Sequence, residues 1–414
     1  MEVYLSKIFR RDNMKSAIFL TIKEMDSINE TGIYHDFINE LGKYYDKVLV
    51  VSPIQRRNKS KTHIKEFKNI NILRVKIPNI TKTNVIEKGI STVLIESLYD
   101  KALKKFYSKE NFDTIFYSTP PITFPNLISN LKKRNNATTY LMLKDIFPQN
   151  AIDLNMFKKT SPFYSFFRIK EKKTYRISDY IGVMSPKNKE FILKHNKFID
   201  KNKVHIFRNA LYDTSKEIEI NKEKLYTKYN LNTNKVTFIY GGNLGAPQGA
   251  ENIKEVIKNF NKVENGQLVI VGSGTKFAEI QNYGEKIDNV HIFNQLPKND
   301  YDELLKVSDV GLIFLDKRFT IPNYPSRLSS YLMLSKPILA MTDPNTDIGL
   351  EIVNNQCGYW INDGNVDNFI DKAVEISNNH ELRTKMGNNS KLMFNNYFKI
   401  ENNVKNMMDF IYRY

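Results

Sequence analysis

Short, continuous runs of apolar residues recur through the first half of the chain, and stretches with helical periodicity separate most of them. These runs predict strands at 17–21, 48–52, 72–75, 114–117, 139–143, 180–184 and 204–207. Uninterrupted apolar runs of this length are typical of parallel strands that are buried on both faces. We therefore expect an α/β domain with a parallel sheet covered by helices on both faces.

The second half repeats this alternation without repeating the sequence. Its apolar runs predict strands at 237–240, 267–271, 290–293, 310–315, 337–340 and 358–361, and two helices close the chain, the last at about 400–412. A chain of 414 residues is long enough for two domains. We predict Rossmann-like domains at 1–208 and 209–394, a linker at 209–221, and a C-terminal helical segment at 395–414 that packs back on the first domain.

The position of the predicted sheets indicates where a ligand binds. Open parallel sheets bind ligands beyond the carboxyl ends of their strands. Two such sheets that face each other form a cleft, and we predict the active site there.

The most informative local pattern is a strand at 236–240 followed by a glycine-rich loop and a helix that begins near Gln248. A helix leaves its first backbone N–H groups unpaired, so this arrangement suits a phosphate. The glycines at 241, 242, 245 and 249 match neither the dinucleotide fingerprint nor the P-loop. A turn that needs positive φ remains the alternative interpretation.

Charge is distributed unevenly. Residues 1–213 hold 39 Lys and Arg against 21 Asp and Glu, whereas residues 214–414 hold 23 against 24, so the net charge of +17 comes from the first half. Between Phe157 and Arg176 basic residues alternate with aromatic ones, a pattern typical of a segment that lies on anionic lipid. The alternative is a solvated helix whose aromatic side chains face the core. No nucleic-acid-binding motif is present, so we expect no nucleic-acid partner.

Cysteine content and hydropathy bear on location. A lone Cys357 excludes a disulfide framework and a cysteine metal site. No apolar stretch approaches the roughly 18 residues of a membrane-spanning helix, and residues 1–13 lack the apolar segment of a signal peptide. We expect a cytoplasmic protein that binds peripherally to the inner face of the plasma membrane.

Five motifs in order resemble the retaining enzymes of glycosyltransferase family 4. They are Gly32 in the first loop, Lys144-Asp-Ile-Phe-Pro148, Gly242-Asn-Leu-Gly245, Val271-Gly-Ser-Gly274, and Tyr324-Pro-Ser-Arg-Leu-Ser-Ser-Tyr-Leu332 leading to Lys336-Pro337. The resemblance implies a GT-B fold, in which two Rossmann-like domains face each other across a cleft. It is strongest to the group that builds bacterial capsule, exopolysaccharide and O-antigen units on a lipid carrier.

The resemblance also implies a binding site for a nucleotide-sugar donor in the second domain. The residues assigned to it are Arg208, Gly242, Asn243, Gly245, Gln248, Gly272, Gly274, Gln295, Ser326, Arg327, Ser330 and Glu351. Gly32 and Asp145 are assigned to the acceptor, and Asp145 and Arg327 to catalysis. Asp145 follows a strand, where its carboxylate could accept a proton or stabilise positive charge on the sugar. Its alternative role is to cap the helix after Pro148.

The chain departs from the family pattern at two pairs of positions. Many family members carry Arg and Lys where this chain has Asn243 and Gln248, and two glutamates where it has Pro322 and Ser330. Arg327 is therefore the best candidate to neutralise the donor diphosphate, because a guanidinium can bind phosphate oxygens bidentately. Arg208 is a second candidate.

A metal cofactor is not expected. Asp300-Tyr-Asp302 resembles the Asp-x-Asp metal motif, but its position favours the start of a helix, where carboxylates interact well with the helix dipole. We expect metal-independent catalysis without any cofactor.

The predicted function is retaining transfer of a sugar, from a UDP-sugar, to an undecaprenyl-diphosphate-linked glycan in capsular or exopolysaccharide synthesis. A non-catalytic partner subunit with the same fold is one alternative, because the two residue pairs are missing. A nucleotide-sugar epimerase with the same fold is another.

Overall fold

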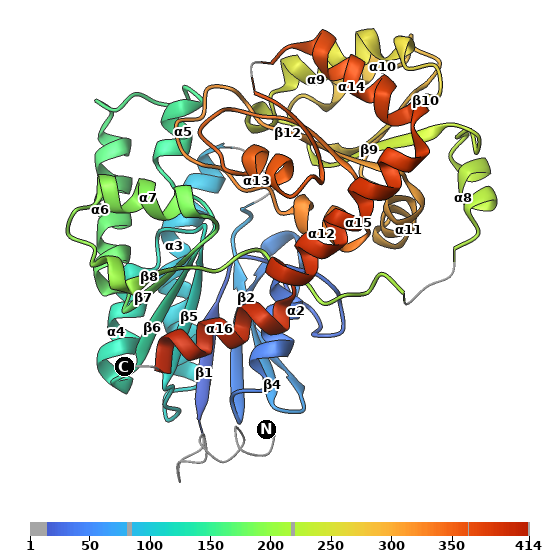
Figure 1. The fold of residues 1–414 in the computed structure, drawn as a ribbon. Coiled ribbons are helices and arrows are strands. Elements are labelled where there is room, and N and C mark those ends of the chain that lie inside the picture. The colour runs from blue at the N-terminus through green and yellow to red at the C-terminus, as the bar shows by residue number, and fades with distance from the viewer. Residues whose placement is uncertain (1–14, 81–84, 217–219, 363, 413–414) are drawn as a thin grey trace.

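A computed structural model describes residues 15–80, 85–216, 220–362 and 364–412, so residues 1–13, which lack the apolar segment of a signal peptide, lie outside it. Two α/β lobes are stacked one above the other, and the chain crosses between them twice (Figure 1). The last two residues of the predicted C-terminal segment and residues 217–219 of the predicted linker also lie outside the described residues.

The first sheet has the order β3-β4-β2-β1-β5-β6-β7-β8 within the described residues. Its strands are β1 (Ser16–Leu20), β2 (Lys47–Gln55), β3 (His63–Phe67), β4 (Ile70–Ile77), β5 (Thr114–Thr119), β6 (Thr138–Leu143), β7 (Tyr180–Val183) and β8 (Val204–Ile206). All pairs are parallel except β3 with β4. The sequence predicted every strand but β3, which lies in a basic stretch and is only partly buried.

Helices cover both faces of this sheet, as predicted. They are α2 (Ile33–Leu41), α3 (Val85–Phe106), α4 (Pro125–Asn135), α5 (Gln149–Asp153), α6 (Pro162–Ile177) and α7 (Pro186–His195). One face packs its apolar side chains against α3, α4, α6 and α7. The other packs against α2 and the C-terminal helix α16 (Ile400–Tyr412).

The second sheet is parallel throughout, with the order β11-β10-β9-β12-β13-β14. Its strands are β9 (Val236–Asn243), β10 (Gly266–Ser273), β11 (Val290–Phe293), β12 (Val310–Phe314), β13 (Ile338–Met341) and β14 (Gly358–Ile361). Its helices are α8 (Lys222–Lys228), α9 (Ala250–Asn259), α10 (Phe277–Gly284), α11 (Lys298–Val307), α12 (Arg327–Met333), α13 (Ile348–Asn354), α14 (Val366–Asn378) and α15 (His380–Tyr397). The six predicted strands are all present within three residues of their predicted limits.

The helix after the glycine loop begins later than predicted. A 3₁₀ turn, Ala246–Gln248, precedes α9, which begins at Ala250. Gly249 adopts φ 61° between them, and a Cβ atom there would lie 3.1 Å from the carbonyl oxygen of Leu315. The tight approach to the end of β12 therefore requires glycine and delays the helix.

The two crossings between the lobes run side by side. Leu211 donates a backbone hydrogen bond to Phe398 and accepts one from Ile400, each 3.0 Å long. After this contact α16 lies across the first lobe, drawn in red in Figure 1, and buries Val404, Met407 and Ile411 against it. The first domain is thus completed by residues from the end of the chain.

Candidate functional site

Arg327 begins α12 directly beside the glycine loop that follows β9. Its guanidinium lies 4.1 Å from the centre of the Tyr240 ring. A Cβ atom on Gly242, which has φ 141°, would lie 2.8 Å from Arg327 Nη2, so the close approach depends on glycine. Nη1 of Arg327 is buried and has no hydrogen-bond partner among the described residues. An unused, permanently charged donor beside bare backbone suits an anionic oxygen.

Three tyrosines surround Arg327, and sequence reasoning missed all of them. The Tyr240 hydroxyl donates 2.8 Å to the carbonyl oxygen of Asn243. The Tyr331 hydroxyl contacts the carbonyl oxygens of Ile239 and Leu312, each at 3.2 Å. The Tyr301 ring occupies the space where a Gly241 side chain would lie, and burial raises the Tyr301 pKa to about 12. No local signal could reveal this arrangement, because the three rings come from β9, α11 and α12.

The side-chain amides of Asn243 and Gln248 bind each other across the glycine loop. Asn243 Nδ2 donates 2.7 Å to Gln248 Oε1, which also accepts the backbone N–H of Gly245 at 3.3 Å. Where related enzymes are expected to hold two cations, this chain holds two side chains that bind each other. Arg327 therefore supplies a cation directly beside this loop.

Gly272 and Gly274 support the loop from the neighbouring strand. A Cβ atom on Gly272 would collide with the carbonyl oxygen of Gly242, and one on Gly274 with that of Leu244. The structure therefore gives both glycines a packing role, whether or not they also contact a nucleotide.

Ser330 and Gly32 line one cavity of about 480 Å³ between the domains. Ser330 lies one helical turn after Arg327, so both side chains lie on the same side of α12. The walls come from the loop before α2, from the linker, and from α11 and α12. The structure thus joins a predicted acceptor residue and a predicted donor residue in one cavity, and Arg327 lies one helical turn from Ser330 without lining the cavity itself.

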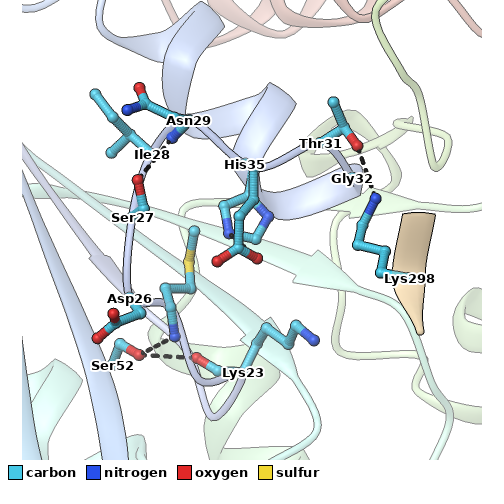
Figure 2. A network of polar contacts seen from close by, with 12 residues as sticks. Lys23, Asp26, Ser27, Ile28, Asn29, Thr31, Gly32, His35, Ser52 and Lys298 are labelled. Atoms are coloured by element: carbon cyan, nitrogen blue, oxygen red, sulfur yellow. Dashed lines mark hydrogen bonds and ion pairs between the residues drawn. The ribbon is translucent and has the colours of Figure 1, made fainter.

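The loop between β1 and α2 closes one side of this cavity. Figure 2 shows Lys298 reaching from α11 to Thr31, where its Nζ donates 3.0 Å to the threonine hydroxyl. Ser52 fixes the start of the loop by donating 2.9 Å to the Lys23 carbonyl. The Gly32 N–H donates to Asp36 at 3.1 Å, so the Gly32 amide is not available to a ligand in this conformation.

His35 lies in the first turn of α2, and its Nε2 is 3.6 Å from the carboxylate of Glu30 in the loop before that helix. Burial lowers the His35 pKa, and the Glu30 carboxylate only partly offsets this effect. His35 is therefore neutral near pH 7, and the contact is not an ion pair at that pH.

Arg208 and Glu351 pair with each other across the domains. Arg208 Nη1 and Nη2 donate to the two oxygens of Glu351 at 3.0 and 2.7 Å, and Nη1 also donates 2.8 Å to the Tyr324 hydroxyl. Tyr324 in turn binds Glu351. These two predicted donor residues thus neutralise each other in this conformation and link the domains.

Asp145 follows β6 at the carboxyl edge of the first sheet. Both of its carboxylate oxygens accept 2.8 Å hydrogen bonds from Asn150 Nδ2. Burial raises the Asp145 pKa to about 6, although hydrogen bonds from Ile146 N–H and Asn150 oppose the shift. The alternative role as a helix cap is wrong, because Pro148 occupies the N-cap of α5 and no side chain caps it.

Lys144, which is not among the predicted site residues, is the second ionisable group at this edge. Its Nζ is buried, has no hydrogen-bond partner within the described residues, and lies 5.0 Å from the centre of the Phe207 ring. Burial lowers its pKa to about 7. Lys144 and Asp145 therefore both titrate close to neutral pH.

The remaining predicted residues make no hydrogen bond to Arg327 or Asp145 in the described contacts. Ser326 and Gln295 are exposed, and Ser326 makes no capping hydrogen bond to α12. Asp300 binds Lys228 at 2.8 Å and Tyr229 at 2.6 Å, and Asp302 binds Lys298 at 2.5 Å. No group of three or more His, Cys, Asp or Glu side chains that could hold a metal ion occurs among the residues described.

Comparison with known proteins identifies the second domain. Residues 221–393 match the family described as Glycosyl transferases group 1. The chain is 21% identical over 286 residues to the probable glycosyltransferase WbjE of Pseudomonas aeruginosa, covering 69% of this chain and 70% of that protein. The second half therefore resembles a glycosyltransferase group 1 domain over residues 221–393.

Solved structures of similar architecture cover both domains. Sucrose-phosphate synthase (tll1590) from Thermosynechococcus elongatus matches with a TM-score of 0.73 at 13% identity, covering 96% of this chain and 98% of that one. HepE from Anabaena in complex with UDP and glucose gives 0.69 at 11%, and the lipopolysaccharide-biosynthesis glycosyltransferase WaaG gives 0.65 at 14%; each match covers 96% of this chain and 99% of the other. These likenesses confirm the predicted GT-B fold.

Proposed function

We propose that this glycosyltransferase moves a sugar from a nucleotide-sugar, a UDP-sugar, to a hydroxyl of an undecaprenyl-diphosphate-linked glycan, with retention at the anomeric carbon. The product would extend a bacterial capsular or exopolysaccharide unit. The observation that carries the proposal is the buried, unpaired Nη1 of Arg327 beside the Gly242 loop, one helical turn from the interdomain cavity. A donor diphosphate supplies the anion that this geometry lacks.

In the proposed reaction the bond between the anomeric carbon and the diphosphate oxygen breaks, and a bond from the acceptor hydroxyl oxygen to that carbon forms. The leaving diphosphate gains negative charge, which Arg327 and the backbone near Gly242 stabilise. The acceptor proton passes to Asp145, which is mostly ionised at pH 7 because its pKa is about 6, or to the departing diphosphate. The resemblance to retaining family 4 enzymes implies front-face displacement rather than double displacement, and we propose this course without a metal ion.

Membrane contact at the inner face of the plasma membrane is part of the proposal, and α6 supplies its basis. Phe163 and Ile169 are 67% and 66% exposed on α6, and Met156 just before it is 71% exposed. Phe167 turns the other way and packs 4.9 Å from the Phe147 ring. The exposed face supports the proposed contact with lipid, and the packing of Phe167 agrees with the alternative that aromatic side chains of the segment face the core. No helix in the described ranges is long and apolar enough to cross a membrane.

The purified protein, incubated with a panel of nucleotide-sugars, tests the activity. Hydrolysis or transfer that releases a nucleoside diphosphate from one donor is expected, with the anomeric configuration kept in the product. Transfer should require an undecaprenyl-diphosphate-linked acceptor. Transfer to a soluble sugar phosphate instead would overturn the acceptor assignment. Epimerised free sugar would favour an epimerase, and no reaction with any donor would favour a non-catalytic subunit.

A further inference from the structure

A second interdomain cavity, of about 440 Å³, lies on the side of the molecule where α5, α6 and α7 meet the second domain. Its lining includes three lysines, Lys159, Lys187 and Lys194, against one carboxylate, Glu190. Lys159 and Lys194 are exposed and make no hydrogen bond or ion pair within the described part of the chain. The cavity therefore has a net positive charge that is not neutralised internally.

The same cavity lies beside α5, the helix that contacts the candidate base Asp145. Gln149 lines it, and the next residue of α5, Asn150, holds the Asp145 carboxylate with two hydrogen bonds of 2.8 Å. Gln149 and Asp153 also bind Thr320 of the second domain, which lines the cavity from the other side. A ligand bound there would lie beside the helix whose Asn150 holds the Asp145 carboxylate.

The other boundary of the cavity is amphipathic. Tyr164 of α6 lines the cavity, while its neighbours Phe163, Phe166 and Ile169 form a solvent-exposed stripe at helical spacing. An apolar stripe flanked by lysines fits a molecule that joins an anionic head to a hydrocarbon chain.

We propose that this cavity, lined by Lys159, Lys187 and Lys194, binds the diphosphate group of a polyprenyl-diphosphate-linked acceptor, while Phe163, Phe166 and Ile169 contact the bilayer that holds its chain. The inference rests on the proposed function, since it names where that acceptor binds. Lys187 Nζ donates 3.1 Å to the Pro344 carbonyl of the second domain, so it is held in place at the cavity wall. Lys159 and Lys194 then provide the free charges.

Binding to vesicles tests the site without requiring turnover. One set of phosphatidylcholine vesicles contains undecaprenyl diphosphate, and a second set contains phosphatidylglycerol at the same total negative charge. The double variant Lys159→Ala, Lys194→Ala should bind the diphosphate vesicles about tenfold more weakly, because it loses two charge-assisted contacts to the diphosphate that a phosphatidylglycerol surface does not form. Its binding to the phosphatidylglycerol vesicles should fall much less.

Two further variants separate the site from general charge and from apolar anchoring. Lys101→Ala with Lys133→Ala removes two other exposed lysines of the first domain and should leave binding to both vesicle types unchanged. Phe163→Gln with Ile169→Gln should weaken binding to both types equally. Equal losses on both vesicle types for the Lys159, Lys194 variant, or no loss on either, would overturn the assignment.

Kinetics with the lipid-linked acceptor give an independent measure. The Lys159→Ala, Lys194→Ala variant should raise KM for this acceptor about tenfold and leave KM for the nucleotide-sugar within about twofold. A rise in both KM values would contradict a site for the acceptor alone. Absence of donor turnover in the unaltered protein would instead contradict the proposed function, and the vesicle result would still decide whether the cavity binds diphosphate.

Discussion

The carboxyl edges of the two sheets carry different chemistry. After β6 the first sheet presents Lys144 and Asp145, two ionisable groups whose pKa values burial shifts to about 7 and about 6. After β9 the second sheet presents glycines, two amides that bind each other, and Arg327, which stays charged at any physiological pH. One edge can exchange protons near neutral pH, and the other can hold a fixed negative charge.

The proposed transfer reaction needs two different roles, and the two sheet edges differ in the way that these roles require. Proton transfer from an acceptor requires a group whose pKa lies near the working pH. Stabilising a leaving diphosphate requires preorganised donors whose charge does not change. The predictions below test whether each edge performs its own task.

Asp145→Asn should have the largest effect. Loss of the base should lower kcat by about 10²–10⁴. In the unaltered protein kcat/KM should rise as pH increases through about 6, because Asp145 accepts a proton only when ionised. The variant should lose this limb of the pH profile. Asp288→Asn, at an exposed carboxylate, is the matched control, and an unchanged pH profile in Asp145→Asn would remove Asp145 from catalysis.

Arg327→Ala should lower turnover by about 10²–10³, or about 3–4 kcal/mol, and weaken donor binding less, because the charge on the diphosphate grows towards the transition state. Arg327→Lys keeps the charge without the bidentate fork and should recover part of the activity. Steady-state kinetics with a nucleotide-sugar measure both, with exposed Arg134→Ala as control. Near-normal turnover of a folded Arg327→Ala protein would contradict this role for Arg327 and leave Arg208 as the candidate that neutralises the diphosphate.

Lys144→Met should raise the free energy of unfolding by about 1–2 kcal/mol, since it removes a buried amine without a partner and loses only the contact with Phe207. Burial lowers the folded pKa to about 7. The folded state therefore binds this proton less readily than the unfolded state, and the penalty grows as pH falls from about 10 to about 7 and is constant below.

Urea unfolding at about pH 6 and about pH 9 measures this difference. The gain from Lys144→Met should be larger at the lower pH. Equal stability of the variant and the unaltered protein at both values would mean that Lys144 has a partner that compensates for its burial.

Removal of divalent metal should have the smallest effect. Asp300 and Asp302 already pair with Lys228 and Lys298, and Arg327 is proposed to supply the positive charge. Activity should therefore persist in EDTA. A complete loss that magnesium or manganese restores would restore the two aspartates as candidate metal ligands.

The sequence by itself determined the architecture of this protein. Strands that are buried on both faces need continuous apolar runs, and a run such as Val48–Val51 therefore marks a strand in the sequence. The alternation of such runs with helical stretches implies two parallel sheets. The apolar-run pattern missed β3, a partly buried edge strand in which apolar and polar residues alternate. The sequence also located Arg327 beside the loop through a motif.

Only the tertiary structure decided which side chains meet. Arg208 binds Glu351, which lies 143 residues away, and the rings around Arg327 come from three separate elements. The contact of Lys144 with Phe207 likewise depends on the sheet order, in which β7 pairs with both β6 and β8. Hydrophobic periodicity reports the environment of a few neighbouring residues. Hydrogen bonds, ion pairs and pKa values depend instead on partners that the folded chain brings from elsewhere.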